Sequence, residues 1–189
     1  MRIDWQLDNS YDEVGGEEVL HLAIEDALVS VPREHLRRLE ALVICDADPR
    51  GKALGIWRQD HRGCMIELYA APHVLPLLGL PAQARDFALR LHLAYTLFHE
   101  VGHHVTRVLN PRTTPPRKAA QVEVKIERWA DEYAEKRLRK FVERWTAPGG
   151  IAEAAEGAYV LQIALRALRL EGIFAAKEPG TKLVAASSG

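Results

Sequence analysis

The sequence predicts an α+β fold in which short strands come first and long helices follow. Apolar, β-prone runs occupy 41–45, 54–57 and 64–70, and short runs bounded by turn residues are typical of strands. Apolar residues then recur at helical spacing over 82–109 and 118–145. We therefore expect a small N-terminal β-sheet packed on two long helices, with flanking N- and C-terminal helices as covers.

The first predicted element is an amphipathic helix over 17–30, which Pro32 ends because proline removes a backbone donor. The run ALVIC at 41–45 predicts a strand, since the turn-rich segment DADPRGK follows it. The runs LGIW at 54–57 and CMIELYA at 64–70 predict two further strands, which QDHRG joins as a hairpin.

Three helices are predicted downstream. The first covers 82–109 and is bounded by prolines on both sides. The second runs from about 118 to 145, and the Pro-Gly-Gly segment after it marks its end. The last covers the Ala- and Leu-rich stretch 151–170, which Gly172 terminates, and its charged residues exclude a membrane span.

The 189 residues, of which 48% are hydrophobic and 27% charged, are enough to bury one core. We expect a single domain over 1–174 and a flexible, small and polar C-terminal tail over 175–189. Cys45 and Cys64 are far apart and form no CxxC pair. They predict buried thiols and neither a disulfide framework nor a thiolate metal site.

Charge and the N-terminal sequence limit the expected partners and compartment. Lys and Arg number 25 against 26 Asp and Glu, so no strong field favours nucleic acid or an anionic membrane. The N-terminus is acidic where a secretory signal needs a basic end and an apolar stretch. We therefore expect a cytoplasmic protein that binds neither nucleic acid nor membrane, and its oligomeric state stays open.

The sequence HEVGH at 99–103 carries the strongest chemical signal. Four residues separate His99 from His103, which places both imidazoles on one helix face, one turn apart. Zinc prefers imidazole and carboxylate ligands, and a catalytic site leaves the fourth position to water. Glu100 then projects beside that water as general base and acid. Apolar residues occupy the opposite side of the helix, namely Leu97, Phe98, Val101, Val105 and Val108.

Gly102 lies inside the same helix, where glycine costs about 1 kcal/mol relative to alanine. Its presence predicts that another element approaches the helix closely at this turn. The alternative interpretation of the whole segment is a His-rich helix that is packed or solvated and holds no metal.

The sequence ERWADEYA at 127–134 supplies a second pair of acids. Glu127 and Asp131 share a helix face with apolar or small residues, which predicts that both carboxylates point inward. A zinc ion on Glu127 and a ligand imidazole N–H on Asp131 would satisfy both charges. Salt bridges to Arg or Lys are the alternative.

HExGH followed, after a proline-containing loop, by E-x-x-A-D-x-Y-A resembles the gluzincin zinc metallopeptidases, especially the minigluzincin and ImmA/IrrE-type groups. The resemblance implies a zincin-like fold, with Glu127 as the third zinc ligand and Asp131 as the support of a ligand histidine. It also implies that Ala130, Tyr133 and Ala134 are packing residues. It is specific over about 95–140 and looser upstream.

The resemblance further implies that the strand before the metal helix, here CMIELYA at 64–70, lies at the sheet edge and pairs with an extended substrate. An ordinary edge strand covered by a loop is equally compatible with the sequence. Glu123, one turn before Glu127, is a second possible ligand. It is the weaker one, because Glu127 rather than an aspartate would then support the histidine.

The remaining candidates are less specific. His104, Arg107 and Tyr159 are weak candidates for the group that stabilises the oxyanion. His104 lies about 100° from His103 around the helix, which predicts a cleft-lining or solvated residue. His92 is seven residues before His99 and too distant to be a ligand, so we expect a hydrogen-bonded core or cleft histidine.

Taken together, these residues predict a zinc metallopeptidase that acts on a peptide or protein substrate, with Zn²⁺ held by His99, His103 and Glu127. Two alternatives remain open at this point. One is a zinc-containing regulatory module of ImmA/IrrE type, which binds or cleaves one partner protein with little general proteolysis. The other is a metal-free helical protein in which HEVGH is accidental.

Overall fold

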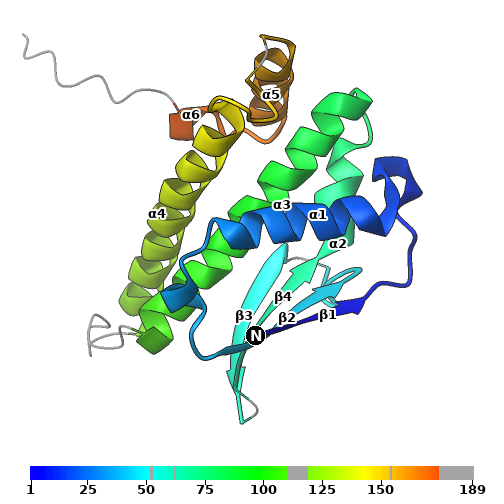
Figure 1. Cartoon of the computed structure of the whole chain (residues 1–189). Helices are drawn as coiled ribbons and strands as arrows, with labels where there is room; N and C mark the ends of the chain where they lie inside the picture. The colour runs from blue at the N-terminus through cyan, green and yellow to red at the C-terminus, as the bar shows by residue number, and fades with distance from the viewer. Residues whose placement is uncertain (52, 62, 110–118, 154, 175–189) are drawn as a thin grey trace, which may run out of the picture.

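The computed structural model describes residues 1–51, 53–61, 63–109, 119–153 and 155–174, and these form an α+β fold (Figure 1). Four strands form one mixed sheet: β1 (Arg2–Gln6), β2 (Leu39–Cys45), β3 (Gly55–Asp60) and β4 (Gly63–Tyr69). The strand order is β1-β2-β4-β3. β1, β2 and β4 are parallel, and β3 runs antiparallel to β4.

The predicted hairpin is confirmed as β3 and β4, but the prediction that the CMIELYA strand lies at the sheet edge was wrong. β4 pairs with β2 on one side and with β3 on the other, so it is an inner strand. The edge strand of the hairpin is β3. β1 was missed altogether, because its sequence RIDWQ is only five residues long and contains only two apolar residues, Ile3 and Trp5.

The long helices agree with the predicted ranges. α1 (Gly16–Val29) precedes β2, and α3 (Ala82–His104) continues into a π-helical turn at Val105–Leu109. α4 (Ala119–Thr146) follows. A short helix that was not predicted, α2 (Ala70–Val74), begins directly after β4. No described helix combines the length and the apolar character that a membrane crossing requires.

The predicted last helix over 151–170 is shorter in the structure, and a separate short helix follows it. α5 (Ala155–Ala167) ends before Arg169, which has a left-handed backbone with φ of 56°, and α6 (Glu171–Phe174) contains Gly172. The N–H of Leu170 bonds back to the carbonyl of Leu165 at 2.8 Å, as in a helix-ending Schellman turn. Arg169 therefore ends the helix, and the prediction that Gly172 does so was wrong.

The sheet and helices form two layers with one core. α1 and α3 cross the same face of the sheet, and α4 lies beside α3 on the side away from α1 (Figure 1). The buried side chains of the inner strands belong to the same hydrophobic core as those of α1, α3 and the C-terminal helices. Phe98 of α3 and Phe141 of α4 meet edge to face with ring centroids 6.0 Å apart. Both cysteines are free; Cys64 is buried, as predicted, but Cys45 is only half-buried, so the prediction of a buried thiol was wrong there.

Candidate metal centre

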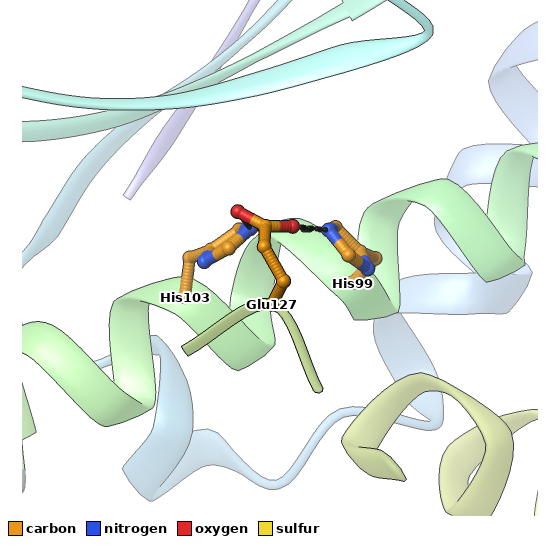
Figure 2. A group of neighbouring side chains, drawn as sticks. All are labelled: His99, His103 and Glu127. Atoms are coloured by element: carbon orange, nitrogen blue, oxygen red, sulfur yellow. Dashed lines mark hydrogen bonds and ion pairs between the residues drawn. The ribbon is translucent and has the colours of Figure 1, made fainter. Parts of the chain in front are cut away.

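The three predicted ligands lie together between α3 and α4 (Figure 2). His99 and His103 lie one turn apart on α3, and their Nε2 atoms are 3.0 Å apart. Glu127 of α4 places one carboxylate oxygen 3.4 Å from His99 Nε2 and the other 3.6 Å from His103 Nε2. Two elements that are separated in the chain therefore direct three ligand atoms to one point.

The spacing of these atoms fits a tetrahedral zinc ion. Bonds of about 2.0–2.1 Å to nitrogen and oxygen make a tetrahedron whose edges are about 3.3 Å long. The two Nε2 atoms are 3.0 Å apart, and each lies 3.4 or 3.6 Å from a different oxygen of Glu127. One ligand atom from each of the three residues lies within 4.8 Å of the other two. Two imidazoles and one carboxylate are also the ligand types of catalytic zinc sites, which keep a fourth position open.

Asp131 sets the orientation of the first histidine. Its Oδ1 lies 3.0 Å from His99 Nδ1. Because a carboxylate only accepts hydrogen bonds, Nδ1 carries the proton and the Nε2 lone pair faces the other ligands. Nδ1 of His103 is buried and has no partner among the described residues. The supporting contact is therefore confined to His99 in the described part of the chain.

Burial keeps His103 neutral. Desolvation, followed by the electrostatic effects of His99 and Arg107, lowers the pKa of His103 from 6.5 to about 4. A neutral imidazole offers the lone pair that a metal ion needs, without first losing a proton.

The prediction that both acids of α4 point into a buried face was wrong. The side chains of Glu127 and Asp131 are 51% and 52% exposed. α4 packs on α3 through Ile126, Ala130 and Ala134, which are buried, and the acids lie about 100° around the helix from this stripe. They border an open cleft, so desolvation alone does not require a partner for either charge.

Glu100 is buried beside the ligands and contacts the edge strand. Its Oε2 accepts the backbone N–H of Trp57 in β3 at 2.7 Å. Burial raises the pKa of Glu100 from 4.5 to about 7, against the lowering effects of His99 and of the Trp57 hydrogen bond. A carboxylate with a pKa near neutrality suits a general base, and a divalent cation nearby would lower that pKa again.

Gly102 marks the close approach that the sequence predicts. A Cβ atom there would lie 2.8 Å from Cα and 3.2 Å from the carbonyl oxygen of Ala130 in α4. Real Cβ atoms essentially never come so near to backbone. The absence of a side chain at Gly102 therefore allows α4 to bring Glu127 and Asp131 up to the histidines.

A cavity of about 340 Å³ surrounds the triad. Besides the ligands and Glu100 it is lined by Gly55, Ile56, Trp57, Arg107 and Glu123. A second cavity of about 270 Å³ adjoins it and shares Gly55, His99 and Glu100, with Tyr95 and Leu54 in its wall. The site is a cleft between edge strand β3 and helices α3 and α4.

Of the candidate oxyanion groups, Arg107 lines the cleft, while Tyr159 on α5 is exposed and lines neither cavity. His104 is fully buried, so its prediction as a cleft-lining or solvated residue was wrong. Its Nδ1 accepts the Trp57 indole N–H at 3.3 Å, and its Nε2 lies 2.8 Å from the Arg37 carbonyl. It packs between α3 and the sheet.

Glu123 does not belong to the metal-ligand group, because its carboxylate pairs with the Arg107 guanidinium. His92 lies against His73, with ring centroids 4.5 Å apart. Nδ1 of His92 is buried without a hydrogen-bond partner among the described residues. The ring nevertheless makes a hydrogen bond to the backbone of His73, so the expectation of a hydrogen-bonded histidine is confirmed.

Two contributors to the site were missed. Trp57 and Gly55 lie in a strand that the sequence predicts, yet no local pattern indicates that this strand faces the HEVGH helix. Comparisons with known proteins add no identity: no family model, no curated protein and no solved structure matches this chain.

Proposed function

We propose that this chain is a zinc-dependent metallopeptidase of the gluzincin type, with a zincin-like fold and Zn²⁺ bound by His99, His103 and Glu127. The observation that supports it is that one ligand atom from each of these residues lies within 4.8 Å of the other two. Asp131 on the far nitrogen of His99 adds the supporting contact that metal-bound histidines commonly have. Glu100, buried beside the ligands, adds an acid that a purely structural site does not need.

When bound, zinc supplies a Lewis acid for the scissile carbonyl and lowers the pKa of water. Glu100 accepts a proton from the attacking water and returns it to the amine of the leaving peptide. The Trp57 N–H, 2.7 Å from Oε2, holds the Glu100 carboxylate in place and leaves its other oxygen to face the cleft. The chain's own contribution is thus a positioned acid and a cleft that orients the peptide.

The free edge of β3 is the surface on which an extended peptide can lie. The Leu54 carbonyl accepts the Tyr69 N–H at 3.0 Å, so alternate residues of β3 bond to β4. The backbone groups of Gly55, Trp57 and Gln59 consequently face away from β4. Because Glu100 already accepts the Trp57 N–H, a substrate strand can pair with Gly55, Gln59 and the Trp57 carbonyl beside Glu100, and such pairing tolerates many sequences.

The test is zinc content together with hydrolysis. Purified protein should contain one zinc per chain by elemental analysis and should cleave an unfolded protein such as reduced casein, and a chelator should stop cleavage. Glu100→Gln should keep the zinc and lose hydrolysis. Full hydrolysis by that variant would contradict the mechanism. Stoichiometric zinc without cleavage would favour the regulatory module of ImmA/IrrE type, and no zinc would favour the metal-free alternative.

A further inference from the structure

Arg107 lies at one end of the cleft and bridges two of its walls. It extends from the π-helical turn that continues α3, four residues after His103. Its guanidinium carbon lies 5.6 Å from the centroid of the Trp57 ring, and its Nη2 pairs with Glu123 of α4. Arg107 thereby contacts both the edge strand and the helix that carries the third metal ligand.

The hydrogen-bonding capacity of this guanidinium is only partly used. Nε of Arg107 is buried and has no hydrogen-bond partner among the described residues. Glu123 is 55% exposed and Arg107 is 31% exposed. Ion pairs between such side chains contribute little to stability, because water screens them. A ligand carboxylate can therefore take the place of Glu123 at small cost.

Charge also favours an anion at this end of the cleft. Arg107 is the only lysine or arginine among the described residues that line the triad cavity, which also holds the carboxylates of Glu100, Glu123 and Glu127. Among the described lining side chains, Arg107 is therefore the one lysine or arginine that attracts an anionic ligand, while the three acids repel it from the rest of the cavity. The planar guanidinium binds a carboxylate through two parallel hydrogen bonds, which gives geometric selectivity as well as attraction.

Trp57 connects Arg107 to the proposed general base, Glu100. Trp57, over which Arg107 lies, donates its backbone N–H to Glu100 and its indole N–H to Nδ1 of His104. Because Nδ1 of His104 accepts that bond, its Nε2–H donates to the Arg37 carbonyl at 2.8 Å. These hydrogen bonds hold the Trp57 ring, which lies under Arg107, at a fixed distance from the Glu100 carboxylate.

We infer that Arg107 is the specificity-determining residue of the cleft and binds a carboxylate of the substrate by displacing Glu123. The inference rests on the proposed peptidase function and names its substrate class: peptides with a carboxylate close to the scissile bond. That carboxylate belongs either to an Asp or Glu side chain or to the C-terminus of the peptide.

The first experiment measures binding without turnover. Zinc-loaded Glu100→Gln protein is mixed with a degenerate pool of octapeptides, half with a free C-terminus and half amidated, and the bound peptides are sequenced by mass spectrometry. We expect enrichment of Asp and Glu at one position or of free C-termini. Labelled matched pairs, Glu against Gln and acid against amide, are then titrated by fluorescence anisotropy.

Removing the carboxylate should weaken binding about tenfold, as for a charged hydrogen-bonded pair. In Arg107→Met the dissociation constants of the two members of each peptide pair should agree within about twofold. Arg107→Lys should give an intermediate ratio of dissociation constants, because lysine keeps the charge but cannot form two parallel hydrogen bonds. Glu123→Gln should strengthen binding of the acidic peptide. Arg128→Met is the matched control, since Arg128 pairs with Glu132 on an exposed part of α4, and it should leave the ratio unchanged.

The role of Arg107 is refuted if the protein that keeps Arg107 binds acidic and neutral peptides equally. It is also refuted if Arg107→Met keeps its zinc and shows the same preference for acidic peptides. Wild-type digestion of the same pool separates the two proposals. Cleavage with no acidic preference refutes the role of Arg107 alone. Acidic selectivity in binding without any cleavage refutes the peptidase function alone, and neither binding nor cleavage contradicts both.

Discussion

Gly102→Ala tests whether close packing of α4 on α3 builds the metal centre. The new Cβ would lie 2.8 Å from Cα of Ala130, where ordinary contact begins at 3.4 Å. The two helices must therefore separate by about 0.6 Å or more unless another part of the fold yields. Metal sites tolerate deviations of about 0.2 Å in ligand distance, so this displacement moves Glu127 out of range.

Two free-energy terms oppose each other in this variant. Alanine favours an ordinary helix over glycine by about 1 kcal/mol. Forcing an extra methyl group against rigid backbone costs about 3 kcal/mol, the upper part of the usual overpacking range. We expect a net loss of about 2 kcal/mol in the free energy of unfolding of the metal-free protein and a loss of about 10–100-fold in zinc affinity.

The assay is urea unfolding without metal, followed by zinc competition against a chromophoric chelator. Gly172→Ala is the matched control, because a Cβ at this helical glycine of α6 meets nothing within 4 Å. It should stabilise the protein by up to about 1 kcal/mol and leave zinc affinity unchanged. If Gly102→Ala behaves like Gly172→Ala in both measurements, the argument from close packing is wrong.

Two further predictions follow from single contacts. Asp131→Asn should lower zinc affinity about 10–100-fold in the chelator competition, because Asp131 contacts Nδ1 of His99. Urea unfolding of the metal-free protein should change little, because the Asp131 side chain is half exposed. An unchanged zinc affinity would refute the supporting role of Asp131. His73→Gln should make stability less sensitive to acid. Burial, then neighbouring His92, lowers the pKa of His73 from 6.5 to about 3, so the native state binds fewer protons than the unfolded chain in this range, and stability falls as pH drops from 6.5 towards 3. Urea midpoints between pH 7 and 4 check this, and an equally steep fall in the variant would contradict it.

The triad was predictable because its determinants are local. The four-residue spacing of His99 and His103, and of Glu127 and Asp131, places each pair on one face of its own helix, whatever the rest of the fold does. The glycine between the histidines then indicates that another element lies close. Local spacing does not report how far the second helix is rotated, and for this reason the burial of the two acids was predicted wrongly.

Strand order was not predictable from the same kind of pattern. The hairpin of β3 and β4 has an obvious sequence signal, but either strand could have paired with β2. That choice depends on how the parallel connection from β2 passes over the sheet, which is a long-range matter. The consequence is functional, since it decides that β3 and not β4 offers a free backbone edge to the cleft.

Two glycines, one in α3 and one in β3, determine how closely α4 and β3 approach α3. Gly102 faces Ala130 of α4, and Gly55 of β3 faces Thr96 and Glu100, where a Cβ would lie 2.8 Å from Cγ2 and 3.1 Å from Cγ respectively. Neither glycine is at a turn, and a glycine inside a helix or strand weakens it. Each is therefore best explained by the approach that it permits. One approach sets the distance of Glu127, the proposed third ligand, and the other sets the distance of Glu100, the proposed general base. The two halves of the proposed chemistry therefore depend on separate packing contacts of a single helix.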